Sequence, residues 1–303
     1  MAQRVARMVR ELEPEDFHLL SGVEHGMRFS EWVDRSRLPE FARLTAEEVN
    51  YRLERCLKRK LVERKTIQYE GIRLRMSGYD ALALHTFAER ETITDFGAPL
   101  GVGKESDVFE VRSYRPMALK FHREGYANFR RVNREREYTA DRDHVSALYT
   151  ARKAAEREYD LLERLYPAVP VPRPEDHNRH AIVMEKIDGI ELSRTGLPGD
   201  QVVPVLSAIL EAIAETYDRG IVHADMSEYN VFVRSAGITI FDWPQAVERD
   251  HPNAEELLAR DVKNIVGYFQ QKYPNRIPDV DAADITTAIM AGTFDPAGLE
   301  RAA

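Results

Sequence analysis

The hydrophobic pattern of the chain changes near residue 90, and this change is the strongest constraint on its fold. Before it, apolar residues recur at helical spacing; after it, short stretches such as "DVFEV" and "MALKF" alternate apolar and polar residues, as strands do. A chain of 303 residues is long enough for two domains. We therefore predict an α+β protein with one domain at residues 1–90 and a second at 91–303.

Residues 44–90 contain the clearest helical pattern of the first domain. Thr45 is followed three residues later by Glu48, which is the spacing of a capping box. The next apolar residues recur at intervals of four, and they predict a helix at about 46–60. Further helical segments are expected near 14–25 and 28–43.

A hairpin is predicted directly after the 46–60 helix. Two alternating stretches, "LVERKTIQY" and "IRLRMS", meet at Glu70 and Gly71, and Ser77 is placed to cap a second helix. Helices followed by a hairpin and another helix are the order of a winged helix. We therefore expect an N-terminal winged-helix domain.

Basic side chains are concentrated in this domain. Residues 45–75 hold 9 basic and 5 acidic residues, although the whole chain has a net charge of −8. Lys and Arg bind phosphate backbones with little regard to sequence, whereas many charged helix faces are only solvated. Because the architecture favours the first interpretation, we predict nucleic-acid contacts by four residues: Arg52, Arg55, Lys58 and Arg59.

The second domain begins with a glycine-containing loop before a strand. Gly101, Gly103, Lys104 and Ser106 form the pattern "GVGKES", in which glycines let a backbone approach a phosphate closely. Ser106 replaces the third glycine of a GxGxxG loop. By itself the pattern is therefore weak.

Lys120 lies between apolar residues in the predicted strand "ALKF". A buried ammonium group needs a partner, unless the strand is at an edge and the lysine stem reaches solvent. Glu158, on a helix predicted to end before Pro167, is the candidate partner.

The stretch "IVHADMSEYNVFV", residues 221–233, sets polar residues between two apolar flanks. Asp225 and Asn230 lie five positions apart, and Asp242 follows at the predicted end of a strand in "FDW". An Asx-capped turn would explain the first two, but the further acid favours a metal site. Enzymes that transfer phosphoryl groups use a set of parts in a fixed chain order, and this sequence has the same order. It contains a glycine loop, a lysine in a strand, a glutamate in a helix, an aspartate with an asparagine, and an aspartate at a strand end.

The motifs "GVGKESDVF", "HADMSEYNVFV" and "FDWPQAV" resemble those of the atypical RIO protein kinases. The "GxGKES" loop, the "D-aromatic-P-Q" motif and the winged helix resemble the second, Rio-two type of that family. The resemblance covers residues 97 to about 290. It implies a bilobal protein-kinase-like domain with lobes at about 91–183 and 188–303.

The resemblance also implies a role for each matching residue, with ATP and Mg²⁺ as cofactors. Asp225 would be the catalytic acid/base residue, and Asn230 and Asp242 would hold Mg²⁺. Asp242 would also accept a phosphate in an ATPase cycle. Six residues would form the phosphate-binding part of the ATP site: Gly101, Gly103, Lys104, Ser106, Lys120 and Glu158. Three more would lie at the adenine: Met184, Glu185 and Ile187.

Members of the family act in maturation of the small ribosomal subunit, so the implied partner is a precursor particle with its rRNA. The sequence departs from the family motifs in two small ways. "HAD" replaces the more common "HGD", and Trp243 replaces the more usual Phe. A third is larger, because no "APE" segment follows. Phosphorylation of ordinary protein substrates is therefore in doubt.

Two alternatives stay open at this point. A small-molecule phosphotransferase of the aminoglycoside-kinase type shares the pattern "H-x-D-x-x-x-x-N", but rarely carries a basic winged helix. A nucleic-acid-binding regulator that senses nucleotide would not need every catalytic residue. The single cysteine and the lack of a signal or membrane segment favour a cytoplasmic protein without membrane contact. We also expect a mobile loop in the arginine-rich stretch 122–144.

Overall fold

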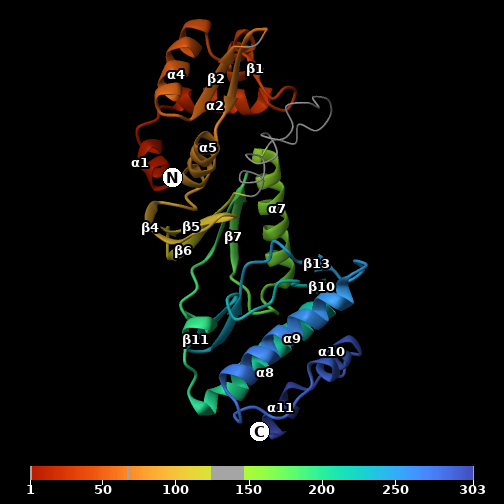
Figure 1. Ribbon diagram of the computed structural model, residues 1–303. Helices are drawn as coiled ribbons and strands as arrows, with labels where there is room; N and C mark the ends of the chain where they lie inside the picture. Colours follow the sequence, from red (N-terminus) through yellow and green to blue (C-terminus); the bar gives the residue numbers. More distant parts are fainter. Residues whose placement is uncertain (1, 67, 124–146, 303) are drawn as a thin grey trace. The chain divides into compact units, whose positions relative to one another are not determined.

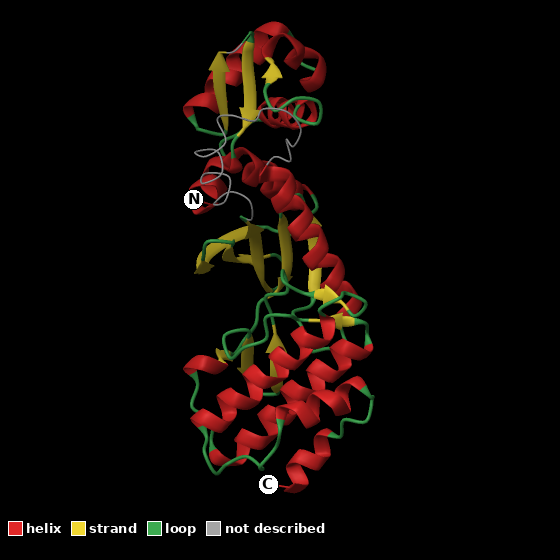
Figure 2. Ribbon diagram, turned by 45° about the vertical axis from the view of Figure 1, so that its right-hand side comes forward, coloured by secondary structure: helices red, strands yellow, loops and turns green. Residues whose placement is uncertain are grey.

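The computed structural model describes residues 2–66, 68–123 and 147–302 (Figures 1 and 2). Most of the expected arginine-rich loop lies outside these residues. Contacts divide the chain into two compact units, one of Met1–Tyr159 with Glu175–Glu185 and one of Asp160–Pro174 with Lys186–Ala303. Each unit is therefore built from two separate parts of the chain.

The first unit begins with the expected winged helix. A three-stranded antiparallel sheet of order β1-β3-β2 accompanies its helices. The elements are α1 Ala2–Val9, α2 Pro14–Gly26, β1 Val33–Asp34, a 3-10 turn at Arg35–Arg37, α3 Leu38–Ala42, α4 Ala46–Lys58, β2 Val62–Thr66, β3 Glu70–Leu74 and α5 Met76–Glu89.

Three local predictions in the winged helix are wrong. Residues 28–43 form no single helix, because Val33 pairs with Ile72 in the sheet. The hairpin turn precedes Glu70, which already pairs with Thr66. Ser77 does not cap α5; its hydroxyl donates to the carbonyl of Lys60 instead.

A five-stranded sheet of order β4-β5-β6-β8-β7 follows in the same unit. The alternating stretches form β5 and β6 as predicted, whereas β4 and β7 were not expected from the sequence. Its strands are β4 Asp95–Val102, β5 Ser106–Arg112, β6 Pro116–His122, β7 Pro174–Asn178 and β8 Ala181–Glu185, and helix α7 spans Ala147–Leu165.

The winged helix and the five-stranded sheet share one hydrophobic core. Buried side chains of the helices, such as Leu53 and Phe87, belong to the same cluster as Phe109, Phe121 and Val183 of the strands. Burial of apolar surface is the main favourable contribution to folding. The predicted boundary near residue 90 thus separates the winged helix from the five-stranded sheet but does not separate two cores.

The second unit consists mainly of helices with short hairpins. Helix α8 packs against α9 and α11, and α10 packs against α9 (Figure 1). Helix α11 was not predicted. The helices are α8 Val202–Asp218, α9 Ala254–Lys272, α10 Ala282–Met290 and α11 Pro296–Ala302; the strands are β9 Ile190–Glu191, β10 Ile221–Val222, β11 Val231–Arg234, β12 Gly237–Ile240 and β13 Val247–Glu248; and two 3-10 turns lie at Leu192–Arg194 and Gly199–Gln201.

A glycine follows the end of α8. Gly220 has a φ of +81°, a conformation that glycine adopts at little cost, and its N–H donates to the carbonyl of Tyr217. The chain then enters β10 and the polar stretch that follows it. No helix among the described residues is long and apolar enough to span a membrane.

Two of the four predicted nucleic-acid residues are bound inside the winged helix. The Arg55 guanidinium donates to both oxygens of Asp16, at 2.9 and 3.2 Å, and Asp16 is fully buried. The Arg52 side chain is 8% exposed and donates to Glu13 and Glu48. Because these donors are occupied by carboxylates, the structure argues against nucleic-acid contacts by Arg52 and Arg55.

Replacing Arg55 by methionine should lower the thermal midpoint of the protein. Asp16 would stay buried without its bidentate partner, which we expect to cost about 2 to 3 kcal/mol because Arg52 lies only 3.6 Å away and compensates part of the charge. The midpoint can be followed by circular dichroism.

The matched control is Arg10→Met. The Arg10–Asp95 ion pair is 71% and 63% exposed, so its loss should leave the midpoint almost unchanged. Equal midpoints for the two variants would contradict an anchoring role for the Arg55–Asp16 pair.

Candidate active site

Lys120 and Glu158 form the predicted ion pair in the first unit. Lys120 lies in β6, a central strand that pairs with β5 and β8, so it is not an edge lysine. Its Nζ donates to Oε1 of Glu158 on α7 at 2.8 Å, and the side chains are only 6% and 3% exposed. Burial raises the pKa of Glu158, but the Lys120 charge and His122 outweigh it and lower that pKa to about 2.

His122 is a further partner of Glu158 that was not identified from the sequence. Its Nε2 lies 3.0 Å from Oε2 of Glu158, the oxygen that Lys120 does not use. Residues i and i+2 of a strand point to the same face, so Lys120 and His122 reach Glu158 together. The i, i+2 spacing of Lys120 and His122 in the predicted strand is the sequence signal that could have identified His122. Each oxygen of the carboxylate thus has a nitrogen close to it, Nζ of Lys120 at Oε1 and Nε2 of His122 at Oε2.

The glycine-containing loop connects β4 and β5. Gly101 lies within β4, opposite Val108, and the loop itself begins after Val102. The loop is closed by a 2.8 Å hydrogen bond from the Gly103 N–H to the Ser106 carbonyl. A Cβ at Gly101 would meet no described atom within 4 Å, so open space lies above this backbone. Lys104 is exposed at the tip of the loop, and Ser106 begins β5.

The predicted adenine-facing residues lie at the end of β8 and just beyond it. Met184 and Glu185 pair with Ala118 and Met117 of β6, so the backbone at this point is fixed by the sheet. Ile187 follows the strand and belongs to the second unit.

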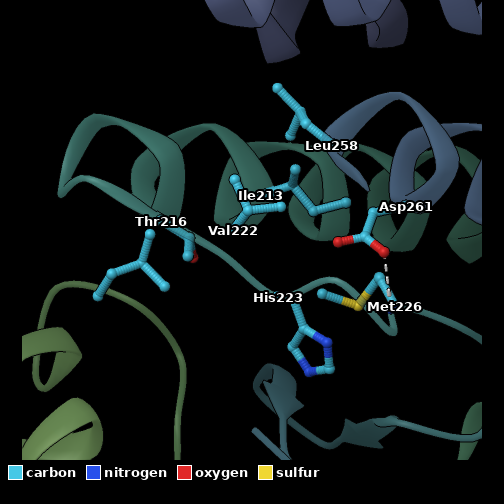
Figure 3. A pocket seen from close by; sticks show the side chains of 8 residues that line it. Ile213, Thr216, Val222, His223, Met226, Leu258 and Asp261 are labelled. Carbon is cyan, nitrogen blue, oxygen red and sulfur yellow. Dashed lines mark hydrogen bonds between the residues drawn. The ribbon is translucent and has the colours of Figure 1, made fainter. Parts of the chain in front are cut away.

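Asp225 is exposed, and side chains of α9 fix the backbone around it. Asp261 of α9 accepts hydrogen bonds from the N–H groups of Ala224, at 2.7 Å, and Met226, at 2.9 Å (Figure 3). Arg260 and Asn264 donate to the carbonyls of the same two residues. Helix α9 therefore holds the backbone on both sides of Asp225.

A small closed cavity lies beneath this backbone. Figure 3 shows Asp261 and Met226 on one side of it and His223 near them, with apolar side chains of α8 and α9 around the rest. His223 accepts from the Asp225 N–H through Nδ1 and lies 3.3 Å from the Phe241 carbonyl through Nε2. Nε2 therefore carries the ring proton. The ring also lies against Trp243, the residue that replaces the usual Phe.

The hairpin of β11 and β12 brings Asn230 and Asp242 to one end. Val231 pairs with Ile240, and the Phe241 N–H donates to the Asn230 carbonyl at 3.0 Å. Asp242 has a φ of +66°, which is costly for a residue with a Cβ and is typical of functional positions. Ala224, at +64°, shares this feature, which explains why a related sequence would favour glycine there.

The oxygen atoms of Asn230 and Asp242, at this end of the hairpin, are suitable ligands for Mg²⁺. Asn230 uses its Nδ2 to donate to the Asp225 carbonyl at 2.8 Å, so its Oδ1 is oriented as an oxygen ligand. No group of three or more His, Cys, Asp or Glu residues that could hold a metal occurs in the described part of the chain. Mg²⁺ commonly takes one or two protein oxygens together with water and substrate phosphate. Asn230 and Asp242 would hold the ion, which would neutralise charge on phosphate oxygens.

The predicted site residues thus form two clusters, one in each unit. The first contains Lys120 and Glu158 with the glycine-containing loop nearby in the same sheet. The second contains Asp225, Asn230 and Asp242. Residues that position these clusters and were missed from the sequence are His122, His223, Arg260, Asp261 and Asn264.

The pH dependence of the folding stability should reflect the ionisation of Asp261. Burial raises its pKa to about 6, although two backbone N–H groups and Arg260 act in the opposite direction. Because the pKa is higher in the folded state, this residue's contribution to stability is full below about pH 4 and is lost as pH rises to about 6. We expect a loss of about 2 to 3 kcal/mol across this window.

The measurement compares the thermal stability of wild type and Asp261→Asn between pH 4 and 7. Asparagine does not ionise, so the advantage of wild type over the variant should shrink as pH rises. A constant difference over this range would contradict a raised pKa for Asp261.

Comparisons with known proteins identify the family of the chain. Residues 107–283 match the RIO domain family, and residues 9–90 match the family described as Rio2, N-terminal. A RIO-type serine/threonine-protein kinase Rio2 of Methanocaldococcus jannaschii is 40% identical over 252 residues, which cover 81% of this chain and 92% of that protein. Serine/threonine-protein kinase rio2 of Schizosaccharomyces pombe is 36% identical, over 88% of this chain and 79% of that one.

A solved structure is also similar over nearly the whole chain. It is the Rio2 kinase-ADP/Mg²⁺-phosphoaspartate complex of Chaetomium thermophilum, with a TM-score of 0.79 and 32% identity over 98% of this chain and 96% of that chain. These matches confirm the predicted fold class, an N-terminal winged helix followed by a protein-kinase-like domain. The chain belongs to the RIO family of protein kinases, in its Rio2 branch.

Proposed function

We propose that this protein is a Mg²⁺- and ATP-dependent kinase and ATPase that acts in maturation of the small ribosomal subunit. The observation that carries the phosphoryl-transfer activity is the buried Lys120–Glu158 pair. A buried lysine held in one position is a preformed partner for phosphate oxygens. The similar Chaetomium structure, a complex with ADP and Mg²⁺, supports the choice of nucleotide and metal.

The first unit would bind the nucleotide. Lys120 would neutralise phosphate charge, and Glu158 with His122 would keep its ammonium group in place. The open space above Gly101 would admit phosphate groups close to the backbone. Backbone groups of Glu185 and Ile187, beside Met184, would bind the adenine.

The second unit would supply the acceptor and the metal ligands. A carboxylate oxygen of Asp242 would attack the γ-phosphorus, and the bond to the bridging oxygen would break so that ADP leaves with the electron pair. Water would then hydrolyse the acyl phosphate, and inorganic phosphate would leave. Asp225, exposed on a backbone that Asp261 fixes, would transfer the proton of that water.

The chain after Asp242 supports an acceptor within the protein. Only the short strand β13 and turns separate Asp242 from α9, which begins at Ala254. This segment leaves little chain for the activation and peptide-binding elements of ordinary protein kinases. The similar Chaetomium structure is a phosphoaspartate complex, which agrees with the proposal.

Labelling with γ-³²P-ATP and Mg²⁺ tests the acceptor. We expect wild type to retain protein-bound label that hydroxylamine removes, and Asp242→Asn to retain none. Asp225→Asn should lower the rate of phosphate release by about 100-fold, since it removes the proton-transferring group. Asp250→Asn is the control, because Asp250 is an exposed acid of the same segment.

Label that resists hydroxylamine, or that persists in Asp242→Asn, would contradict the aspartyl phosphate. Wild type without any nucleotide hydrolysis or label would contradict the enzymatic function itself.

The winged helix would contact rRNA in a cytoplasmic precursor particle. Lys58 is exposed at the end of α4, and Arg59 is 27% exposed with only a 3.7 Å contact to Glu11. These two residues remain candidates after Arg52 and Arg55 are excluded. Charge complementarity with a phosphate backbone supports this surface.

The double substitution Lys58→Glu/Arg59→Glu should weaken binding to small-subunit rRNA by about tenfold at moderate salt and make its salt dependence shallower by about one to two units. Co-sedimentation with precursor particles and filter binding can measure both. Lys263→Glu, an exposed lysine of α9, is the control. Unchanged binding in the double variant would contradict a contact by this surface.

A further inference from the structure

A cluster of four buried polar side chains connects the winged helix to the five-stranded sheet. Asp80 comes from α5, Asp107 from β5, Arg123 from the end of β6, and His180 from the turn before β8. Asp80 and His180 have no exposed surface, and Arg123 and Asp107 are 8% and 9% exposed. All four belong to the first unit. This cluster lies outside the groups assigned to catalysis above.

Asp80 is the centre of the cluster. Arg123 donates to both of its oxygens, Nη1 to Oδ1 at 2.6 Å and Nη2 to Oδ2 at 3.1 Å. His180 Nε2 lies 2.7 Å from Oδ1, so it carries the ring proton and donates to Asp80. Burial raises the pKa of Asp80, but the Arg123 charge and His180 outweigh it, and the carboxyl stays ionised.

Arg123 also holds the glycine-containing loop. Its Nε donates to Oδ2 of Asp107 at 2.8 Å, and its backbone N–H donates to the Glu105 carbonyl at 2.7 Å. Glu105 and Asp107 flank Ser106, which pairs with His122 at the last position of the β5–β6 register. The Arg123 guanidinium therefore joins the winged helix to Asp107, and the backbone N–H of the same residue holds Glu105 on the other side of Ser106.

The loop has little other support. Residues 101–105 are exposed. Gly101 and Val102 pair with β5, and beyond them the only backbone hydrogen bond within the loop that the described residues make is that of Gly103 to Ser106. The N–H donors of an arginine lie in one rigid plane. A partner that fixes the orientation of this plane therefore also fixes the position of any group bound by the remaining donors. Asp80 fixes two of the nitrogens, and the third then fixes Asp107.

We propose that Arg123 is a positioning residue for the phosphate-binding loop and that Asp80 of the winged helix sets its position. The winged helix thereby contributes to nucleotide affinity without touching the nucleotide. This inference rests on the proposed binding of Mg-ATP by the same loop. A partner that shifts α5 would change the nucleotide affinity, and bound nucleotide would change the affinity for that partner by the same factor.

Calorimetric titration of the full chain with Mg²⁺ and a non-hydrolysable ATP analogue tests the proposal. Asp80→Asn and Asp107→Asn should each weaken binding by about tenfold. Because both act through Arg123, the double variant should bind about as weakly as either single variant. Additive losses would overturn the shared route.

Asp16→Asn is the matched control. Asp16 is another fully buried aspartate of the winged helix with a bidentate arginine, but its partner Arg55 does not reach the loop. We expect this variant to lose thermal stability and keep wild-type nucleotide affinity. Equal losses of affinity in Asp16→Asn and Asp80→Asn would overturn the proposal, since any damage to the winged helix would then have the same effect.

If Asp80→Asn does not fold, Asp107→Asn and Arg123→Lys carry the test. Lysine keeps the charge but cannot hold Asp80 and Asp107 together, so affinity should again fall about tenfold. Wild-type affinity in these folded variants would overturn the proposal. Wild type that does not bind the nucleotide would instead contradict the proposed function.

Discussion

The buried carboxylates of the described residues need donors inside the protein, and four of them fix the structure at separate points. Asp16 joins α2 to α4, Asp80 joins α5 to β6, Glu158 joins α7 to β6, and Asp261 joins α9 to the backbone around Asp225. A buried charge without partners is costly, so Asp16, Asp80 and Asp261 each accept hydrogen bonds through both oxygens, while Glu158 accepts one from Lys120 and lies 3.0 Å from Nε2 of His122. The four residues tie together elements that are distant in sequence.

The carboxylates with proposed chemical roles are placed differently. Asp225 is exposed and Asp242 is half-buried, whereas Asp261, which accepts from the backbone on both sides of Asp225, is buried. Asp242 and Ala224 also adopt left-handed backbone conformations, which persist only because the surrounding contacts enforce them. Reactive groups thus stay accessible on a backbone whose shape is fixed from beneath. Such preorganisation is what phosphoryl transfer needs, since the protein contributes mainly by positioning charge.

Sequence reasoning succeeded where the signal is local. Helical periodicity identified α4, and the spacing of Asp225, Asn230 and Asp242 follows from a turn and one hairpin. It failed where partners are distant: Arg52 and Arg55 have the spacing of a surface helix, but their carboxylates lie on α2 and just before it. Asp261 and His122 were missed for the same reason. The strands β4 and β7 lack clear alternation, and only pairing with neighbours makes them strands.

The divided sequence of the first unit also has a consequence during synthesis. Strand β8 completes the pairing of β6, and Arg179 beside it binds Glu24 of α2, yet both follow α7 in the chain. While translation continues through residues 160–185, for about a few seconds, one edge of β6 has no partner strand. The N-terminal half of the nascent chain is then open to incorrect pairing, and a chaperone that covers this edge would act only until β8 emerges from the ribosome.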